Sequence, residues 1–321
     1  MVRYTVRRLL QAVPLVFGAA VVTWILIHAA PGDPIVALAG EDGDAGYYAM
    51  MRERFGLERP LHEQLFVYLG RLAQGDLGFS YRQNRSAVSV ILDQLPATLL
   101  LMVPALAIAS VIGISVGTVA AARKNSALDN TARTATLLGH AVPVFWLSQV
   151  LLLLFALRFD WFPVQGRSDA RADYEGLRAL LDVGHHMVLP IAALVTVYVP
   201  PIMRVTRAAV IENLDEMYIR AARARGQSRR RVLIRHALPN ALLPIVTVIG
   251  SQIGFMFAGS VLVETVFAWP GLGRLLLSAI LARDFAIITA MLLMLSVTII
   301  LMNLVTDLLY SLLDPRVRHG I

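Results

Sequence analysis

The chain contains no cysteine, and only 16% of its residues carry charge. Without cysteine, disulfide bridges and thiolate metal sites are excluded. A soluble domain carries about 25% charged residues. The 57% hydrophobic content and the mean hydropathy of +0.65 therefore indicate a polytopic membrane protein. Lysine occurs once, at Lys124, so the net charge of +7 comes almost entirely from arginine.

The sequence also lacks the motifs of an ATPase or a hydrolase. There is no Gly-Lys dipeptide, so a Walker A loop is absent and the chain cannot hydrolyse ATP by that route. Neither a His-Glu-x-x-His motif nor a Ser-His-Asp arrangement is visible. The histidine pair His185-His186 lies where an external helix is expected to begin, and we interpret it as interfacial. We therefore expect no catalytic residue, metal or cofactor on this chain.

Six windows without Asp, Glu, Lys or Arg are long enough to cross a bilayer, which takes about 20 apolar residues. They run over residues 9–32, 94–122, 134–157, 183–203, 236–263 and 285–306. The predicted fold class is therefore all-α, with six transmembrane helices. The first window is expected to be a retained helix, because it exceeds the roughly 7–15 apolar residues of a signal peptide.

The basic residues of the loops predict the orientation of the chain. The loop 204–235 carries nine arginines against three acids, and the N-terminus, the loop 123–133 and the C-terminus are also basic. The segment 33–93 carries six arginines and nine acids, and the loop 158–182 carries four and five. Both termini are therefore predicted to be cytoplasmic. Because the arginines follow the membrane topology, we expect lipid and protein partners and no nucleic acid.

The chain is expected to form one membrane core with a small external cap. Residues 1–93 supply the first transmembrane helix and the cap. Residues 94–309 form the core with five helices and a basic cytoplasmic loop at 207–239, and residues 310–321 are a cytoplasmic tail. Within the cap, helical spacing of apolar residues occurs at 47–55 and 61–72.

The loop between the fourth and fifth windows has the pattern of two helices separated by a glycine. Apolar residues at three- and four-residue spacing predict a helix over 211–226. Acids lie in its first turns and arginines in its last, which suits the helix dipole. Gly226 is placed to end this helix in a left-handed conformation. Ser228 is placed to cap a second helix that begins at Arg229.

The first of these helices has the features of a docking surface. Ala221 and Ala222 form a face of small residues that lets another protein approach the helix backbone. The surrounding arginines, such as Arg220, supply donors for carboxylates or carbonyls on that partner. An equally simple interpretation is that the basic loop lies on anionic lipid.

The pattern Ala221-Ala222-x3-Gly226, followed by Leu238-Pro239, resembles the EAA loop of binding-protein-dependent ABC importer permeases. Arg220 replaces the usual Glu of that loop and His236 the usual Ile, which matches the dipeptide, oligopeptide and nickel branch. The layout, with a long insertion after the first window, resembles the B-type permease. Further segments that resemble this branch are Pro31-Gly32-Asp33-Pro34, Gly75-Asp76-Leu77-Gly78, Leu95-Pro96-Ala97-Thr98, Glu264-Thr265, Pro270-Gly271-Leu272-Gly273, Asp307-Leu308-Leu309-Tyr310 and Leu313-Asp314-Pro315-Arg316.

The resemblance implies a type I ABC importer transmembrane domain in a bacterial cytoplasmic membrane. The chain would be a permease subunit forming half of a pathway for peptides or a related solute, with nickel and glutathione also open. Its implied partners are a homologous second permease, ATP-binding cassette subunits that hold ATP and Mg, and an external solute-binding protein. The loop 207–239 would be the coupling loop. The implied ATPase-coupling residues are Arg220, Ala221, Ala222, Gly226, Leu238 and Pro239.

Polar residues inside the windows are candidates for the translocation pathway, because burying them in lipid is costly. Gln252 lies in mid-window beside a stripe of small residues that includes Gly250, and Glu264 lies close to a helix end. Packing and helix capping are the alternative roles for these residues. In the second window, Gly113 and Gly117 form a similar stripe, which we interpret as a packing face.

Two other classes of function were weighed against the importer. An autonomous ion-coupled secondary transporter more often shows inverted repeats, broken helices and acids in mid-membrane, and none of these is evident in the sequence. An intramembrane enzyme needs a nucleophile and base or a metal site within the windows. Of these three classes of function, only the importer accounts for the basic loop from Arg220 to Pro239.

Overall fold

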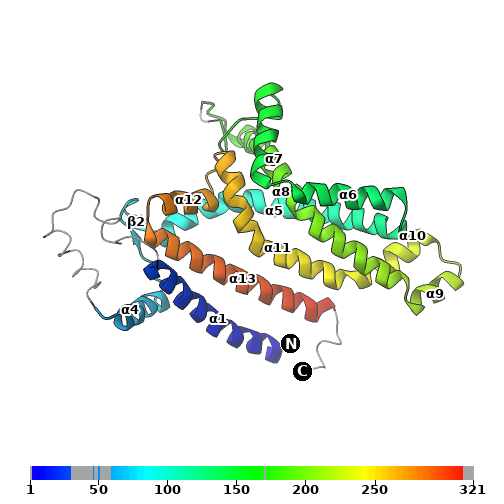
Figure 1. Ribbon diagram of the computed structural model, residues 1–321, viewed down its shortest axis with the longest axis horizontal. Helices are drawn as coiled ribbons and strands as arrows, with labels where there is room; N and C mark the ends of the chain where they lie inside the picture. The colour runs from blue at the N-terminus through cyan, green and yellow to red at the C-terminus, as the bar shows by residue number, and fades with distance from the viewer. Residues whose placement is uncertain (1, 30–45, 47–49, 51–58, 170, 314–321) are drawn as a thin grey trace. The chain divides into compact units, whose positions relative to one another are not determined.

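The computed structural model describes residues 2–29, 46, 50, 59–169 and 171–313, and most of them lie in long helices (Figure 1). The predicted cap helix at 47–55, the break at Pro31 and most of the predicted tail lie outside these residues. The elements are α1 (Val2–Ala29), α4 (Leu61–Ala73), β1 (Phe79–Ser80), β2 (Arg85–Ser86), α5 (Ala87–Ala122), α6 (Ala127–Ala141), α7 (Val144–Leu151), η1 (Leu152–Arg158), α8 (Gly176–Leu214), α9 (Met217–Ala224), α10 (Arg229–Val232), η2 (Leu233–Ala237), α11 (Leu238–Val266), α12 (Leu272–Leu281) and α13 (Phe285–Leu313).

Within the described residues, five helical stretches are long and apolar enough to span a membrane. They are Leu9–Leu26, Ala87–Ala122, Gly176–Leu214, Arg229–Gly254 and Phe285–Thr306. A sixth span is obtained if the pair Ala127–Ala141 and Val144–Arg158 is counted as one. The chain is thus a multi-pass membrane protein, and the apolar helices follow the predicted windows.

The third window, 134–157, was expected to be one helix, and this expectation is wrong. The two halves, Ala127–Ala141 and Val144–Arg158, meet at an angle of 95°. Pro143 lies at the break, and Val142 before it is extended, with φ −77° and ψ 124°. A residue that precedes proline is driven out of the helical conformation by the proline ring. The window therefore records apolar length but not the bend.

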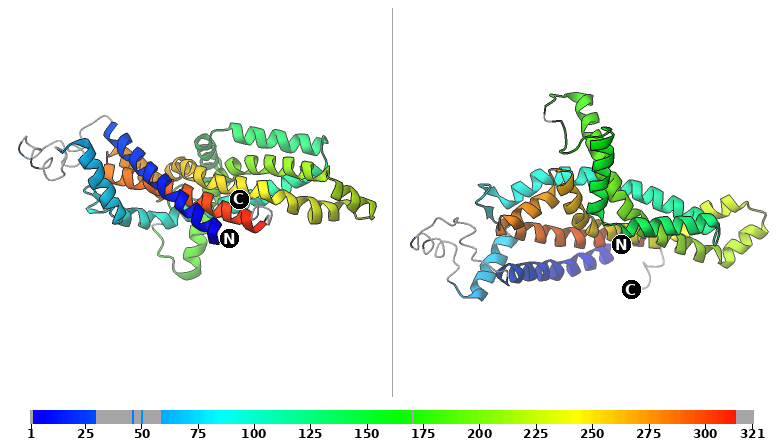
Figure 2. Two further views of the ribbon diagram at one scale, coloured as in Figure 1. Left: turned by 90° about the horizontal axis from the view of Figure 1, so that it is seen from below. Right: turned by 45° about the horizontal axis from the view of Figure 1, so that its top comes forward.

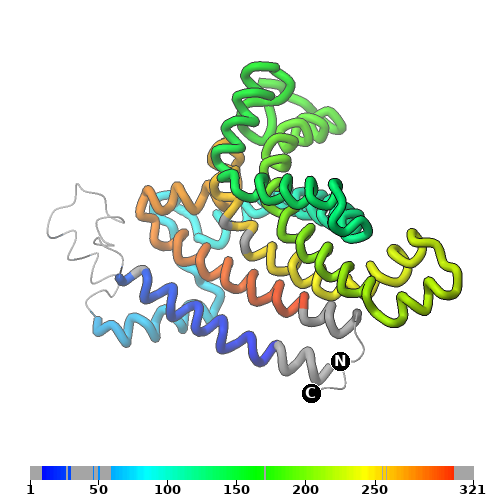
Figure 3. The backbone as a smooth tube through the Cα atoms, turned by 45° about the vertical axis from the view of Figure 1, so that its right-hand side comes forward, coloured from blue at the N-terminus to red at the C-terminus, as the bar shows by residue number. Residues whose placement is uncertain are grey.

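The described chain divides into two compact units. One contains Ala97–Pro270 and the residues from Met302 onward, and the other contains Val2–Pro96 and Gly271–Leu301. In the first unit, α8 packs against α11 and α6 (Figure 2). The segment from α9 to η2 joins the end of α8 to the start of α11 (Figure 3).

Glycines allow α5 and α8 to approach closely within this unit. A Cβ atom on Gly113 would lie 2.8 Å from Cγ2 of Ile202, and one on Gly117 would lie 2.7 Å from the backbone oxygen of Met203. The predicted packing face of Gly113 and Gly117 is therefore confirmed. Gly250 on α11 is similar, because a Cβ there would collide with the Thr306 side chain.

A buried ion pair fixes α6 on α8. The Asp129 carboxylate is fully buried. It accepts hydrogen bonds from Nε and Nη2 of Arg207 at 2.6 and 2.7 Å, and from the backbone N–H of Asn125 at 2.9 Å. Ser126 caps α6 by accepting from the backbone N–H of Asp129. The start of α6 is thus tied to residue 207 of α8 by a charged, two-point contact.

In the second unit, a short hairpin is tied to the start of α13. Strands β1 and β2 are antiparallel, with Phe79 opposite Ser86 and Ser80 opposite Arg85. The buried hydroxyl of Ser80 donates to Oδ2 of Asp284 at 2.5 Å. Asp284 also accepts from the backbone N–H of Ile287, in the first turn of α13. One buried carboxylate therefore holds the hairpin and caps the helix.

Candidate functional site

The candidate site is the segment that links α8 to α11, and its first helix differs from the prediction. A helix was expected over 211–226, but α8 ends at Leu214 and α9 runs only from Met217 to Ala224. Glu216 is the N-cap residue of α9, with extended backbone at φ −71° and ψ 151°. The break at residues 215–216 changes which side chains face inward, because it resets the helical phase.

Gly226 ends α9 as the sequence predicted. Its φ is +76°, a left-handed conformation that favours glycine. Its N–H donates to the carbonyl oxygen of Arg223 at 2.9 Å. A Cβ atom at this position would meet no atom within 4 Å, so backbone conformation and not space selects glycine. Ser228 then caps α10, where its hydroxyl accepts from the N–H of Arg231, which confirms the second predicted feature.

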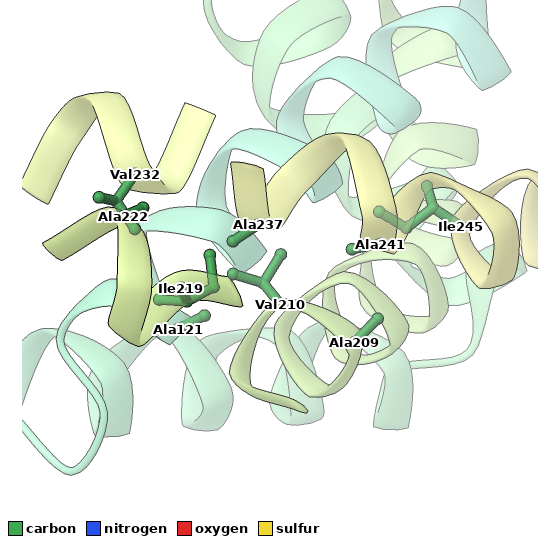
Figure 4. Close-up of a cluster of buried hydrophobic side chains, with 9 residues drawn as sticks. All are labelled: Ala121, Ala209, Val210, Ile219, Ala222, Val232, Ala237, Ala241 and Ile245. Atoms are coloured by element: carbon green, nitrogen blue, oxygen red, sulfur yellow. The ribbon is translucent and has the colours of Figure 1, made fainter. Parts of the chain in front are cut away.

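The two alanines of the motif differ in burial. Ala222 is 1% exposed and lies in a cluster of buried apolar side chains (Figure 4). Ala221 is exposed. The cluster comprises Ala121, Ala209, Val210, Ile219, Ala222, Val232, Ala237, Ala241 and Ile245. The expectation that both alanines present a close-approach face is therefore wrong for Ala222. It packs within its own chain, and Ala221 alone is available to a partner.

The outer face of the segment is basic. Arg220, Arg223 and Arg225 are exposed on and just after α9, and the three arginines of α10 are exposed as well. The guanidinium groups of Arg220, Arg223 and Arg225 form no ion pair with any residue that the structure describes. Positive charge near the last turn of α9 suits its dipole. This face is thus a set of unengaged donors suited to carboxylates or carbonyl oxygens.

Hydrogen bonds brace α9 against both neighbouring helices. The Tyr218 hydroxyl donates to Oδ1 of Asn213 on α8 at 2.7 Å. The same hydroxyl accepts from Nδ2 of Asn240 on α11 at 3.2 Å. His236 and Gln227 form a second contact, with 2.7 Å between Nε2 and Oε1. We call these five residues the polar brace. It joins the end of α8, α9 and the start of α11.

Leu238 and Pro239 lie where α11 begins. Leu238 is half-buried and packs against the apolar cluster of Figure 4, and Pro239 lies in the first turn of the helix. Proline is tolerated in a first helical turn. The preceding turn η2 is π-helical and places Ala237 fully inside the cluster. Ala222 and Leu238 of the motif thus pack at one apolar cluster, although they lie on different helices.

The two candidate pathway residues have different environments on α11. Gln252 is 8% exposed. Glu264 is fully buried, and it accepts a hydrogen bond from the Thr98 hydroxyl on α5 at 2.7 Å. Close by, the indole N–H of Trp269 donates to the carbonyl oxygen of Ala97 at 2.8 Å. The Glu264 carboxylate has a structural role, because it joins α5 to α11 within one chain. The pathway roles of Gln252 and Glu264 stay predictions.

The Asp129–Arg207 pair was missed from the sequence. The sequence offers one clue to this pair: Asp129 is the only acidic residue between Asp93 and Asp160, and it lies in a basic loop. Nothing in the sequence identifies Arg207 among nine loop arginines as its partner.

The histidine pair His185-His186 was interpreted as interfacial. His185 Nε2 lies 2.8 Å from the carbonyl oxygen of Trp161, and His186 is nearly buried beside Asp182.

Comparison with known proteins identifies the family. Residues 113–319 match the family described as binding-protein-dependent transport system inner membrane component, and residues 1–102 match its N-terminal region. The chain belongs to this family. Over 99% of both chains it is 39% identical to the di/tripeptide transport system permease protein DppB of Pseudomonas aeruginosa. It is 37% identical, again over 99% of both, to the dipeptide transport system permease protein DppB of Escherichia coli strain K12.

Solved structures show the same fold. A chain of the inward-facing MetNI methionine ABC transporter superimposes with a TM-score of 0.56 at 17% identity, over 70% of this chain and 96% of that one. The architecture is therefore that of a type I ABC importer transmembrane domain, as the motif resemblance implied. As a member of this family the chain is a transport component.

Proposed function

We propose that this chain is a permease subunit of an ATP-driven importer and forms half of a pathway for di- or oligopeptides or a related small solute. The full-length similarity to two peptide permeases supports this proposal. A homologous second permease completes the pathway, and an external binding protein delivers the substrate. ATP-binding cassette subunits hold ATP and Mg. The membrane is the bacterial cytoplasmic membrane, with both termini inside.

The docking site for the ATPase is α9, and the observation that carries this proposal is its two-sided construction. Its inner side is closed by Ile219 and Ala222, which are 0% and 1% exposed. Its outer side presents Arg220, Ala221 and Arg223. A small side chain flanked by guanidinium groups permits close approach and hydrogen bonding at once. A loop that only lay on lipid has no need of such a fixed inner side.

The motion of α9 passes to the spans through its inner contacts. The apolar cluster joins α9 to α5, α8 and α11, and the polar brace adds directional contacts to α8 and α11. Gly226 sets the reversal after α9, and Leu238 and Pro239 start the returning helix. A displacement of α9 therefore moves the end of α8 and the start of α11 together. Dense packing transmits such a displacement because it resists compression.

The pathway itself is formed with the second permease. We retain Gln252 as the residue of this chain that contributes to it. Gln252 lies in mid-span on α11, where a carboxamide costs free energy in lipid unless it meets polar groups or water. Glu264 also holds α5 and α11 together through its hydrogen bond with Thr98.

The test of this function is transport by the assembled complex. The tagged chain is purified in mild detergent with the subunits that accompany it and is reconstituted in proteoliposomes. A labelled dipeptide and its binding protein are added on the side of the cap, and ATP on the side of α9. We expect accumulation that requires hydrolysable ATP and the binding protein. Glutathione and nickel ions, offered in parallel, identify the substrate class.

Two results would contradict the proposal. Uptake that follows an ion gradient and ignores ATP would establish an autonomous secondary transporter. Recovery of the chain alone, under conditions that keep a known importer complex intact, would remove the ATPase partner on which the role of α9 depends.

A further inference from the structure

A cavity of about 360 Å³ lies between α6 and α8 in the first unit. Its lining includes Arg133, Leu137 and His140 from α6 and Pro200 and Arg204 from α8. This volume is within the range of roughly 300–1,000 Å³ that is typical of small-molecule sites. None of the functions described above uses the cavity.

The cavity is positively charged. Arg133 and Arg204 contribute two guanidinium groups, and no acid is among its lining residues in the described chain. These guanidinium groups donate no hydrogen bond to any described residue. Asp129, the acid of α6, is buried and its two carboxylate oxygens are engaged by Arg207 and by the backbone of Asn125. Arg133 also interacts electrostatically with Asp129 but forms no hydrogen bond with it, so the donors of both guanidinium groups are left for an external anion.

Both arginines lie at the ends of charge-free windows, where the sequence predicts that the chain leaves the membrane. Arg133 immediately precedes the charge-free window 134–157, and Arg204 immediately follows the window 183–203. The lipid headgroups occupy this boundary, outside a hydrocarbon core about 30 Å thick. One helical turn into the windows, Leu137 and Pro200 line the same cavity. Leu137 is 64% exposed and offers an apolar surface beside the charged end.

We propose that this cavity binds the phosphate of an anionic phospholipid, with Arg133 and Arg204 as its ligands. Guanidinium groups recognise phosphate oxygens by paired, charge-assisted hydrogen bonds. Basic pockets between transmembrane helices are known sites for anionic headgroups. Leu137 lies along the first part of an acyl chain. The lipid joins α6 to α8 next to the Asp129–Arg207 pair.

The experiment compares lipid retention by three forms of the purified full-length complex. These are the wild type, the double variant Arg133→Gln/Arg204→Gln, and the matched control Arg123→Gln/Lys124→Gln, which loses the same charge from exposed positions outside the cavity. Each is equilibrated with phosphatidylglycerol and phosphatidylcholine, and bound lipid is counted by native mass spectrometry. One basic residue near an anionic surface contributes roughly a fivefold gain in binding. We expect roughly a 25-fold loss of retained phosphatidylglycerol for the cavity variant and a clearly smaller loss for the control, whose two basic residues lie outside the cavity.

A measurement on the wild type keeps the proposal testable if the cavity variant does not fold. A photoreactive phosphatidylglycerol is expected to crosslink to residues 130–140 of α6. Crosslinking that is distributed evenly along the spans overturns the proposal, as does full retention of phosphatidylglycerol by a folded cavity variant.

Soluble competitors distinguish the source of the anion. If inorganic phosphate displaces phosphatidylglycerol and itself binds to the cavity, the phosphate site is supported but its occupant is not a lipid. If a dipeptide displaces it, the cavity belongs to the transport pathway and the lipid assignment is wrong. Neither result depends on whether the complex imports peptides.

Discussion

Ala221 and Ala222 provide a matched pair of substitutions, because one of these adjacent alanines is exposed and the other is buried. Ala222→Leu inserts three carbon atoms into a cluster in which Ala222 is 1% exposed and Ile219 and Val232 are 0% and 1% exposed. Overpacking of this kind costs about 1–3 kcal/mol of folding free energy. Ala221→Leu places the same atoms in solvent, where a substitution changes stability by less than about 0.5 kcal/mol.

The two variants are expected to fail in different assays. Ala222→Leu lowers the thermal unfolding midpoint of the chain purified alone, because the defect lies within the chain. Ala221→Leu leaves that midpoint unchanged and weakens association with the ATPase by roughly tenfold or more, which corresponds to about 1.4 kcal/mol or more. The thermal midpoint is read in detergent without partners, and association is read from the amount of ATPase that co-purifies.

The reasoning fails in two distinguishable ways. A normal midpoint for Ala222→Leu would show that residue 222 is not packed in the cluster of Figure 4. Normal ATPase association in Ala221→Leu, together with normal ATP-driven uptake, would show that the outer face of α9 is not the docking surface.

Three further predictions concern backbone, packing and charge. In Gly226→Val the valine must adopt a left-handed conformation, which costs an L-residue about 1–2 kcal/mol. We expect this variant to hydrolyse more ATP per dipeptide imported, whereas Gly226→Asn keeps the wild-type ratio because asparagine tolerates this conformation. Equal ratios in the two variants would contradict the role of this turn. Gly117→Ala lowers the thermal unfolding midpoint, because its Cβ would lie 2.7 Å from the backbone of α8. Gly184→Ala leaves the midpoint unchanged, because no atom lies within 4 Å of its Cβ. Equal midpoints for the two variants would show that α5 and α8 are not closely packed. Asp129→Ala leaves Arg207 unpaired and lowers the free energy of unfolding by about 3 kcal/mol, which is the lower end for a buried pair because Arg207 is 18% exposed. A double-mutant cycle with Arg207→Leu measures the coupling between the two residues. Purely additive effects would refute it.

The sequence predicted what depends on composition and on local backbone chemistry. Apolar length identified the spans, because a lipid-crossing helix needs a run of uncharged residues. The turn at Gly226 and the cap at Ser228 were predicted because each depends on one residue and its immediate neighbours. The packing role of Gly117 was recognised for the same reason, since a small residue in a helix signals a close neighbour without naming it.

Other features depend on a partner or a phase that local pattern does not contain. The inward face of α9 was ambiguous because the periodicity fitted either alanine. The break at residues 215–216 sets which face of α9 points inward, because it places Ile219 and Ala222 on the buried side. The contact of Asp129 with Arg207 spans 78 positions, and the bond from Thr98 to Glu264 spans 166. The bend at Pro143 was missed because hydropathy measures the length of an apolar segment and contains no information on the direction of its helix axis.

The polar brace has a kinetic consequence for complex assembly. Tyr218 is hydrogen-bonded to Asn213 on α8 and to Asn240 on α11. The segment between α8 and α11 is therefore ordered by contacts within the chain before any partner binds. A surface that is already ordered loses little conformational entropy on binding. Docking of the proposed ATPase partner is therefore expected to need no folding step and to be governed by encounter, which the exposed arginines accelerate in low salt if the partner surface is acidic.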